Sequence, residues 1–232
     1  MEKFGYTTSG PRKKNEDYYA YETINGSNIF CVADGVGGHS CGEFASKFSV
    51  ELFIQEIKIS MIPNLKSTLQ FVNEKLIVES LKRKECKGMA TTFIGTMIKD
   101  TLVQFVHTGD SRLYLLRGNG LRQLTEDHTE VKRLLSEGLL TQETAIDYPR
   151  RNVLDSALGI ENELMLTYLS FECHFRDRII ISTDGFHGVF SKNELRDLSV
   201  TNKNFDSFCD VLVNELSKRT LIDNATFIAI EI

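Results

Sequence analysis

Hydrophobic and polar positions change their period several times along the 232-residue chain. Short runs of strand-like composition stand near residues 3–8, 18–23 and 28–33. Apolar residues then recur at helical spacing from Gly42 to about Ile57, and again from about Leu65 to Arg83. The first third of the chain is therefore predicted to form three strands followed by two helices.

Each of the two predicted helices has an apolar stripe that we expect to face the core. In the first helix, Phe44, Phe48 and Leu52 follow one another at intervals of four residues. The stripe of the second helix consists of Leu65, Leu69, Val72 and Leu76.

The middle of the chain changes to short β-rich runs separated by turn signals. TTFIGTMI, LVQFVHT and RLYLLRG are predicted strands, and RGNGLRQL has the pattern of a hairpin. Residues 129–147 are predicted to form short helices joined by Gly138. The remaining predicted elements are strands at 164–171 and 178–183, a helix opened by the capping box of Ser191 and Glu194, a helix over about 205–219, and the closing strand ATFIAIEI.

The strands come in antiparallel-looking groups interrupted by helical pairs, and regular alternation of strand and helix is absent. A doubly wound parallel sheet is therefore disfavoured, and two packed sheets flanked by helices are predicted, an α+β fold. The chain has only 3 prolines and no Gly/Ser-rich linker, so residues 1–232 are expected to form a single domain.

Composition excludes several functional classes. A net charge of −5 is unsuited to nucleic-acid binding, and no apolar run approaches a signal peptide or a membrane span. The five cysteines contain no C-x-x-C pair, so neither a disulfide framework nor a zinc site is expected. Cys31 and Cys209 lie in apolar runs and are predicted to be buried thiols. The expected lack of disulfides predicts that the protein resides in a reducing compartment, and the predicted location is the cytoplasm.

Four aspartates occupy equivalent places at strand termini. Asp34 and Asp184 each follow an apolar run inside a repeated D-G-x-x-G frame, Asp110 follows a third run, and Asp223 precedes the last strand by two residues. If the last strand runs antiparallel to its neighbours, all four carboxylates project from one rim. Any one of them taken alone is better explained as a turn or capping residue. Their shared position and the repeated frame favour a common function.

Carboxylates gathered at one rim raise each other's pKa unless a cation compensates them. Glu16 and Asp17 add two more acids beside a predicted strand. Oxygen donors without cysteine or a histidine pair suit Mg²⁺ or Mn²⁺, and two such ions can share a carboxylate and activate a water for attack on phosphorus. The glycines fit this hypothesis, because Gly35 leaves its carbonyl free to face a metal, while Gly37 and Gly38 let a substrate approach the backbone.

Rival motifs are incomplete. Gly35-Val36-Gly37 begins like a dinucleotide fingerprint, but Ser40 occupies the third glycine position and the preceding acid opposes a pyrophosphate. The sequence contains neither a G-x-x-x-x-G-K-[ST] phosphate loop nor a G-x-S-x-G nucleophile elbow.

Eight motifs in order along nearly the whole chain resemble the metal-dependent Ser/Thr protein phosphatases of type 2C, in their compact bacterial branch. They are RKKNED (12–17), VADGVGGHSCGEFAS (32–46), GMATTFIG (88–95), HTGDSRLYLL (107–116), LTEDHT (124–129), NVLDSALG (152–159), STDG (182–185) and DNAT (223–226). The resemblance implies a four-layer α-β-β-α architecture, in which a central antiparallel β-sandwich is flanked by antiparallel helix pairs and has a two-metal site at one end.

The resemblance also implies roles for individual residues. Asp34 would bridge two ions together with the carbonyl of Gly35, and Asp184 and Asp223 would hold the first ion. Glu16 or Asp17 would support the second ion, and Asp110 with Asp184 a weaker third. Arg12 would bind the substrate phosphate, for which a guanidinium is well shaped. The catalytic set expected from the resemblance is Asp34, Asp184 and Asp223.

The implied reaction is hydrolysis of phosphoserine and phosphothreonine in proteins by a metal-bridging water or hydroxide, without a phosphoenzyme, opposing a Ser/Thr kinase. Val36 stands where many eukaryotic members have a histidine general acid, and His39 is expected to be structural. Thr91 and Thr92 are also expected to be structural. The segment near 129–150 is expected to form a flap that selects substrates.

Two alternatives remain beside this reading. One is a catalytically silent binding module, which the full set of acids and Arg12 disfavours. The other is a two-metal hydrolase of small phosphoesters, because a two-metal site is indifferent to the alcohol that it releases. Phosphorylated proteins and a cognate kinase are the expected partners, and a monomer is the expected state.

Overall fold

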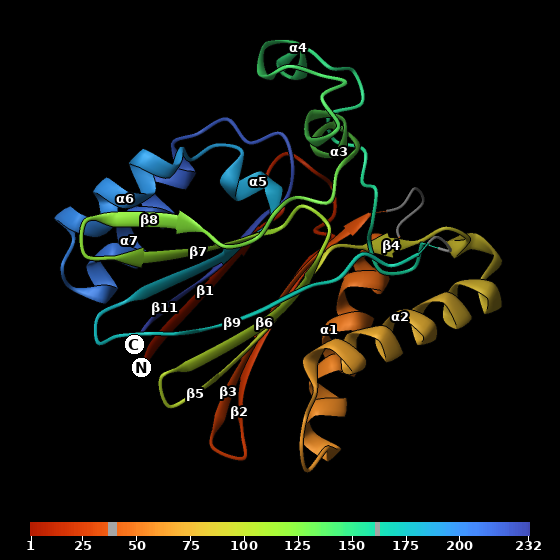
Figure 1. Cartoon of the computed structure of the whole chain (residues 1–232), viewed down its shortest axis with the longest axis horizontal. Helices are drawn as coiled ribbons and strands as arrows, with labels where there is room; N and C mark the ends of the chain where they lie inside the picture. Colours follow the sequence, from red (N-terminus) through yellow and green to blue (C-terminus); the bar gives the residue numbers. More distant parts are fainter. Residues whose placement is uncertain (37–40, 161–162) are drawn as a thin grey trace.

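The computed structural model describes residues 1–36, 41–160 and 163–232. Two antiparallel sheets pack against each other, and helices cover both outer faces (Figure 1). The α+β fold class predicted from the sequence is confirmed, including its four layers.

The first sheet joins the two ends of the chain. Its strand order is β1-β11-β10-β7-β8, and every neighbouring pair is antiparallel. Its strands are β1 (Glu2–Thr8), β7 (Arg112–Arg117), β8 (Gly120–Gln123), β10 (Arg178–Ser182) and β11 (Ala225–Glu231).

The second sheet has the order β2-β3-β5-β6-β9, with the short strand β4 paired to the end of β3. Its strands are β2 (Asp17–Ile24), β3 (Ser27–Val36), β4 (Ala90–Thr91), β5 (Phe93–Lys99), β6 (Leu102–Thr108) and β9 (Thr167–Glu172).

The helices form two covering pairs and a separate projection. Helices α1 (Gly42–Ile59) and α2 (Leu65–Lys82) cover the second sheet, and α6 (Lys192–Thr201) and α7 (Phe205–Ser217) cover the first. Two short helices, α3 (Glu130–Ser136) and α4 (Gln142–Ile146), project above one end of the sheets in Figure 1. Within the described residues, no helix is both long and apolar enough to cross a membrane.

Alternation along the strands decides which side chains lie between the sheets. On β3, Ile29, Cys31 and Ala33 pack towards the helices, whereas Phe30 and Val32 pack between the sheets. Asp34 has the same parity as Phe30 and Val32, so the pleat directs it to the inter-sheet side at the end of the strand. A carboxylate thus replaces an apolar residue where the core meets solvent.

The predicted elements are largely confirmed, with two differences in the helices. The stripe of α2 is buried as expected, but the buried face of α1 includes Ala45, Val50 and Phe53, and the predicted stripe residues Phe44, Phe48 and Leu52 are only partly buried. The large rings of Phe44 and Phe48 stack on each other beside the sheet-facing side. Short α5 (Asp184–His187) was not predicted, because four residues are too few for a periodic signal.

The expectation that the chain contains no disulfide is wrong. Cys41, at the start of α1, is bonded to Cys86 in the short 3-10 helix η2 (Lys84–Cys86) after α2, with 5.4 Å between the two Cα atoms. Cysteines 45 positions apart give no local pattern that would have predicted this pairing. Cys31 and Cys209 are buried thiols as expected, and Cys173 is a third.

Reduction of the Cys41–Cys86 bond is predicted to lower the free energy of unfolding by about 4 kcal/mol, because the bond closes a loop with a sequence separation of 45 and restricts the unfolded chain. Urea unfolding with and without dithiothreitol measures the difference. The double variant Cys41→Ser/Cys86→Ser should show the lower value under both conditions. Equal stability of the oxidised and reduced protein would contradict the prediction.

Candidate metal centre

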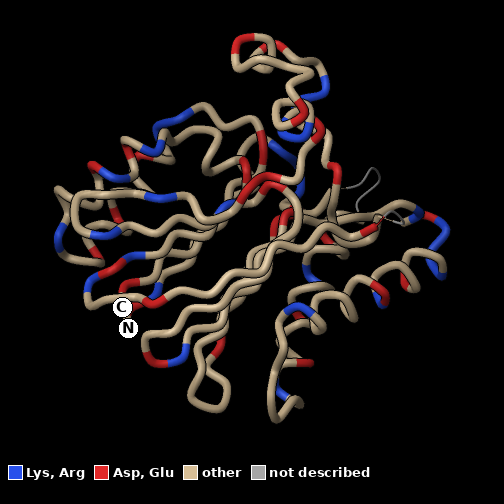
Figure 2. The backbone as a smooth tube through the Cα atoms, viewed as in Figure 1, with Lys and Arg blue, Asp and Glu red and all other residues tan. Residues whose placement is uncertain are grey.

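Both sheets bring strand termini to one edge, which we call the carboxylate edge, defined by Asp17, Asp34, Asp110, Asp184 and Asp223. Asp17 and Asp34 are direct partners in the β2–β3 ladder. Asp110 follows β6 by two residues, Asp184 follows β10 by two, and Asp223 precedes β11 by two. Figure 2 shows the acidic segments meeting at the end of the sheets nearest α3. The predicted convergence of strand termini is confirmed.

Threonines from the neighbouring strands fix the backbone of Asp34. The Thr91 hydroxyl donates to the Asp34 carbonyl at 2.9 Å, and the Thr92 hydroxyl accepts from the Asp34 N–H at 3.0 Å. The Thr92 hydroxyl also lies 2.7 Å from that of Ser111. Thr91 and Thr92 therefore have the structural role expected of them, and these contacts involve the backbone of Asp34 rather than its carboxylate.

Asp17 is held from the opposite sheet. The Thr183 hydroxyl donates to Asp17 Oδ2 at 2.8 Å and accepts from the Thr226 N–H at 3.0 Å. Among the described residues, Asp17 Oδ1 and Asp184 Oδ1 are buried oxygens without a hydrogen-bond partner. Buried carboxylate oxygens without partners are costly, so these two atoms are open acceptors for a ligand of the site.

Arg12 and Asn224 organise the loop between β1 and β2. Arg12 Nη2 pairs with Asp223 Oδ2 at 2.7 Å, although the Arg12 side chain is 57 % exposed. The Asn224 side chain donates to the carbonyls of Ser9 and Lys14 and accepts from the Glu16 N–H. Arg12 and Glu16 are thereby held at the carboxylate edge.

The repeated D-G pair has a packing cause. A Cβ on Gly35 would lie 2.1 Å from the Gly42 carbonyl oxygen, and a Cβ on Gly185 would lie 1.8 Å from the Asn224 carbonyl oxygen. Each glycine lets the backbone beside an aspartate pack directly on another segment. The expectation that the Gly35 carbonyl faces a metal stays a prediction, and the close backbone contact with the start of α1 is a further reason for glycine at this position.

Several aspartates of the edge have raised pKa values, although Arg12 pairs with Asp223. Burial raises the pKa of Asp17 to about 7, assisted by the charges of Asp184 and Asp223. Burial, followed by the charges of Asp17 and Asp184, raises the pKa of Asp34 well above its usual range. The pKa of Asp110 is raised to about 7, again by burial first and then by Asp184. Divalent cations would remove this penalty.

The donor set fits a hard cation. It consists of carboxylate oxygens, two of them buried and unpartnered, with backbone carbonyls nearby. Within the described part of the chain, no three His, Cys, Asp or Glu side chains are already drawn together as around an ion. The contacts account for this spacing, because Asp223 is paired with Arg12 and Asp17 with Thr183. The acids are pre-positioned at one edge and would close on a cation by side-chain movement.

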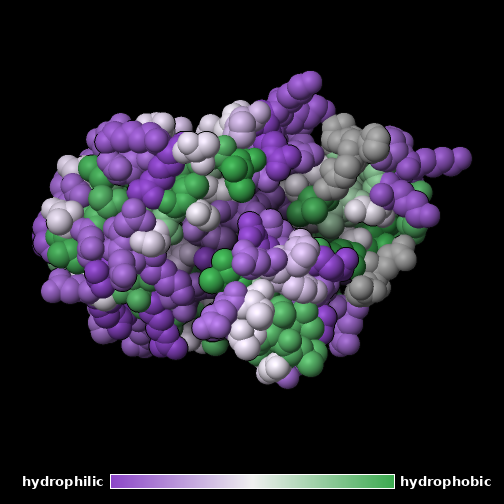
Figure 3. All heavy atoms as spheres, turned by 90° about the horizontal axis from the view of Figure 1, so that it is seen from above, coloured by the Kyte–Doolittle hydropathy of each residue, from purple (hydrophilic) through white to green (hydrophobic). Residues whose placement is uncertain are grey.

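Two hollows meet at the carboxylate edge. The larger, of about 800 Å³, extends from Asp110 and Asp184 under α3 and α4. The smaller, of about 580 Å³, contains Asp34 and Glu16. Figure 3 looks onto this face and shows hydrophilic side chains beside separate hydrophobic patches. Both hollows include Arg12, so the predicted phosphate-binding side chain lies at their junction.

Several residues that support the site were not predicted. Arg112 forms a bidentate ion pair with Asp127, with Nη2 and Oδ2 2.7 Å apart, at the wall of the larger hollow. Thr183 and Asn224 also lacked an assigned role. All four stand inside matched motifs, but their functions depend on contacts between distant segments. Gly37, Gly38 and His39, for which roles were predicted, lie outside the described residues.

The sequence pattern of the protein phosphatase 2C family matches residues 5–225. The chain belongs to the protein phosphatase 2C family. The expected enzyme class is thereby confirmed. A serine/threonine phosphatase, stp, of Listeria monocytogenes is 30% identical over 229 residues, covering 95% of this chain and 91% of the relative. Protein phosphatase PhpP of Streptococcus pneumoniae is 28% identical over 232 residues, covering 95% and 93%.

Solved structures agree with this membership. The serine/threonine phosphatase Stp1 from Staphylococcus aureus superposes with a TM-score of 0.92 at 26% identity, over 100% of this chain and 95% of that one. The serine/threonine phosphatase PstP/Ppp of Mycobacterium tuberculosis gives 0.87 at 26% identity, over 100% and 98%. Together with the eight sequence motifs, this confirms the bacterial branch of the family.

Gly185→Ala is predicted to lower the free energy of unfolding by about 1–3 kcal/mol, because the added methyl group would overlap the Asn224 carbonyl oxygen. Gly120→Ala is the matched control, since its Cβ would meet its nearest neighbour at an ordinary 3.5 Å. Chemical unfolding of both variants measures the contrast. Equal stability of the two would show that the close packing at Gly185 is not required.

Asp110→Asn is predicted to stabilise the metal-free protein increasingly as pH rises from 5 to 7.5. The pKa of Asp110 is about 7 in the fold and lower in the unfolded chain, so folded protein binds more protons in this window and its stability falls with rising pH. Asparagine carries no titrating proton, so the variant does not lose stability through this position as pH rises. The variant should therefore gain in melting temperature over the wild type, with chelator present and more at pH 7.5 than at pH 5.

The readout is the difference between variant and wild type, because burial lowers the pKa of His107 and His187 to about 3 and gives an opposite pH trend in both proteins. Exposed Asp197, which pairs with its neighbour Arg196 at the surface, supplies the control Asp197→Asn, for which the difference in melting temperature should not change with pH. A destabilised Asp110→Asn protein at pH 7.5 would refute the charge argument.

Proposed function

We propose that this chain is a protein phosphatase that hydrolyses phosphoserine and phosphothreonine at a two-cation site on the carboxylate edge. The observation that carries the proposal is the convergence of five aspartates from separate strand termini beside Arg12. The proposed catalytic unit is a single domain over residues 1–232.

Mn²⁺ or Mg²⁺ is the proposed cofactor. Asp34, with the Gly35 carbonyl, would hold both ions, and Asp184 and Asp223 would complete the first site. Glu16 or Asp17 would serve the second, and Asp110 with Asp184 a weaker third. The bound ions supply charge neutralisation and activation of water for attack on phosphorus. The open oxygens of Asp17 and Asp184 support this assignment.

Arg12 is proposed to bind and orient the substrate phosphate. Its side chain is exposed at the junction of the two hollows, and its present partner is the carboxylate of Asp223. A guanidinium forms two parallel hydrogen bonds to phosphate oxygens, so it can exchange a carboxylate for a phosphate without a change of geometry.

The described histidine of the larger hollow is unsuited to act as a general acid. Burial lowers the pKa of His187 to about 3, and its Nε2 lies 3.1 Å from the Asp110 carbonyl oxygen, to which it donates. The imidazole is therefore neutral and occupied at neutral pH. We assign it to positioning the Asp110 backbone.

A protein substrate agrees with the larger hollow better than a small phosphoester does. The hollow continues from Asp184 to apolar positions of the projecting helices, including Leu135 and Ile146, and to exposed Ile222 on the opposite side. These surfaces extend beyond the reach of a single phosphate and could contact residues flanking a phosphorylated side chain. We propose phosphoproteins as substrates, a cognate Ser/Thr kinase as the opposing enzyme, and a monomer acting in the cytoplasm.

Asp34→Asn and Asp184→Asn are each predicted to lower Mn²⁺-dependent hydrolysis of a phosphothreonine peptide by at least about 100-fold, since each removes a charge at the centre of the proposed site. Hydrolysis of the peptide and of an aryl phosphate is measured with Mn²⁺, with Mg²⁺ and with chelator. Arg12→Lys should reduce kcat/KM while keeping Mn²⁺ binding.

Asp197→Asn, away from the carboxylate edge, is the control and should keep full activity. A wild type that binds Mn²⁺ but hydrolyses neither substrate would support a silent binding module instead. Efficient hydrolysis of the aryl phosphate with none of the peptide would favour a hydrolase of small phosphoesters.

A further inference from the structure

We propose that Cys41 and Cys86 form a reversible redox site, whose disulfide tightens the binding of Mn²⁺ at the carboxylate edge and whose reduction weakens it. This inference rests on the proposed function, because it concerns regulation of the same cation site. It is carried by the two chain segments that the disulfide joins: one leads into Gly88 and Ala90, which line the smaller hollow, and the other packs against Gly35 and Glu16, which also line it.

On one side, the disulfide fixes the start of α1. Cys41 directly precedes Gly42, whose carbonyl oxygen packs against Gly35. The Cα atom of Gly42 also lies close to the Glu16 carboxylate, because a Cβ on Gly42 would be 2.9 Å from Glu16 Oε1. One turn later, the Ser46 hydroxyl donates to the Glu16 carbonyl at 2.6 Å. Movement of this turn would therefore displace Glu16, a proposed ligand, and the backbone at Gly35.

On the other side, the disulfide fixes the segment leading into β4. Cys86 is followed by Gly88 and Ala90, which line the smaller hollow with Asp34. β4 then pairs with the end of β3, with Ala90 opposite Val36 and Thr91 opposite Gly35. The Thr91 hydroxyl donates to the Asp34 carbonyl, so this segment also fixes the central aspartate.

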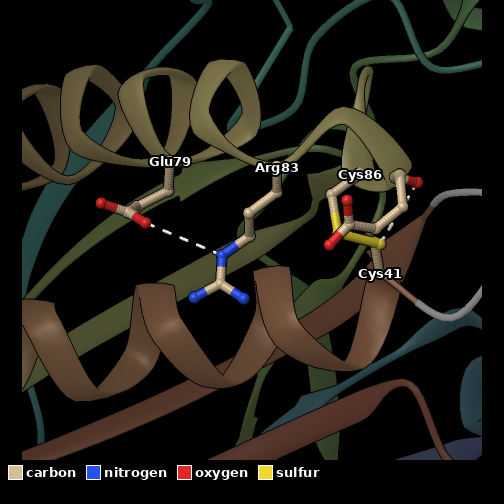
Figure 4. The surroundings of a disulfide bond; sticks show 5 residues. Cys41, Glu79, Arg83 and Cys86 are labelled. Carbon is tan, nitrogen blue, oxygen red and sulfur yellow. Dashed lines mark hydrogen bonds and ion pairs between the residues drawn. A yellow bond between two sulfur atoms is a disulfide. The ribbon is translucent and has the colours of Figure 1, made fainter.

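The bond thus connects two segments of the chain, the start of α1 and the segment leading into β4, and both segments contact Gly35. The close-up in Figure 4 shows Cys41 at the first turn of α1 and Cys86 in the turn after α2. Without the bond, Gly35 is still held by backbone contacts, but the start of α1 and the segment leading into β4 can move relative to each other. Because cation sites require several ligands at fixed distances, this freedom should reduce the affinity for a cation in addition to lowering the free energy of unfolding.

A second contact between α1 and α2 remains when the disulfide is reduced. Arg83, at the end of α2, stacks its guanidinium over the Phe44 ring of α1 at 4.2 Å and so joins the two helices three residues before Cys86. Its Nε also lies 3.8 Å from Glu79 Oε2 on α2 (Figure 4). We therefore expect reduction to loosen the turn around Cys86 while the helices stay in place.

The position of Cys86 permits exchange. Both half-cystines are buried, at 5% and 6% exposure, but the neighbours of Cys86, Glu85 and Lys87, are exposed. A dithiol reductant attacks one sulfur as its thiolate, forms a mixed disulfide, and then closes to its own cyclic disulfide. Two electrons and two protons end on Cys41 and Cys86, and the dithiol is oxidised. Disulfides in reducing compartments are commonly of this exchangeable kind.

The test measures Mn²⁺ affinity by calorimetry with no substrate present, and it compares two preparations of the wild type. One is oxidised by glutathione disulfide. The other is reduced by dithiothreitol, which is then removed under anaerobic conditions. Mass spectrometry after thiol alkylation confirms each state. The expected result is an affinity about five- to tenfold weaker in the reduced protein. Amide hydrogen exchange should increase on reduction around residues 86–91 and 41–46.

Cys41→Ser/Cys86→Ser should match the reduced wild type and ignore both reagents. Cys173→Ala, which removes a buried free thiol of the core between the two sheets, should keep the full redox response. If the double variant fails to fold, the reduced wild type gives the same comparison. Equal Mn²⁺ affinity in the two verified redox states, or failure of Cys41 and Cys86 to pair under oxidising conditions, would overturn the proposal.

The proposed function can fail separately. A protein that binds Mn²⁺ with redox-dependent affinity but hydrolyses no phosphopeptide would retain the redox site and lose the phosphatase assignment. A protein that hydrolyses phosphopeptides equally well in both redox states, with unchanged Mn²⁺ affinity, would retain the phosphatase assignment and lose the redox site.

Discussion

Repulsion among the aspartates of the carboxylate edge is the constraint on which the site depends. Burial and mutual repulsion raise the pKa values of Asp17, Asp34 and Asp110, so the fold keeps these groups together at a cost in stability. Neutral hydroxyls, from Thr91, Thr92 and Thr183, hold the backbone and one carboxylate oxygen in place without neutralising the charge. The remaining charge would give the edge an affinity for divalent cations. A cation that binds only the folded chain would return the lost stability.

The sandwich makes this concentration of charge possible. In antiparallel sheets, the end of one strand lies beside the beginning of the next, so acids that follow β6 and β10 and one that precedes β11 reach the same edge. Apolar layers on both faces of each sheet keep these termini rigid. At Gly35 and Gly185, the absence of a side chain lets backbones from different layers touch directly beside the acids. Charge, packing and hydrogen bonding therefore meet at the same few positions.

The segments around the site differ in how they are attached. Strand termini are held by the core of the sandwich, whereas Cys41 at the start of α1 and the turn after α2 are joined by the Cys41–Cys86 bond. The short helices α3 and α4 project over the larger hollow and supply the surface on which a phosphoprotein would lie. This division would separate the proposed cation chemistry, placed on the strand termini, from the parts that we propose to respond to redox state or substrate.

The sequence by itself determined the elements, the fold class and the acids, because alternation along strands, helical periodicity and the repeated D-G-x-x-G frame are local patterns. It also predicted that the acids share one edge, since antiparallel pairing follows from the order of the strands. Only the tertiary structure decided the partners: Arg12 on Asp223, Thr183 on Asp17, Asn224 on the loop before β2, and Cys41 with Cys86. It also decided that Ala45, Val50 and Phe53, rather than Phe44, Phe48 and Leu52, form the buried face of α1. The physical reason is that these contacts join residues far apart in the chain, and no local pattern records a distance that only packing sets.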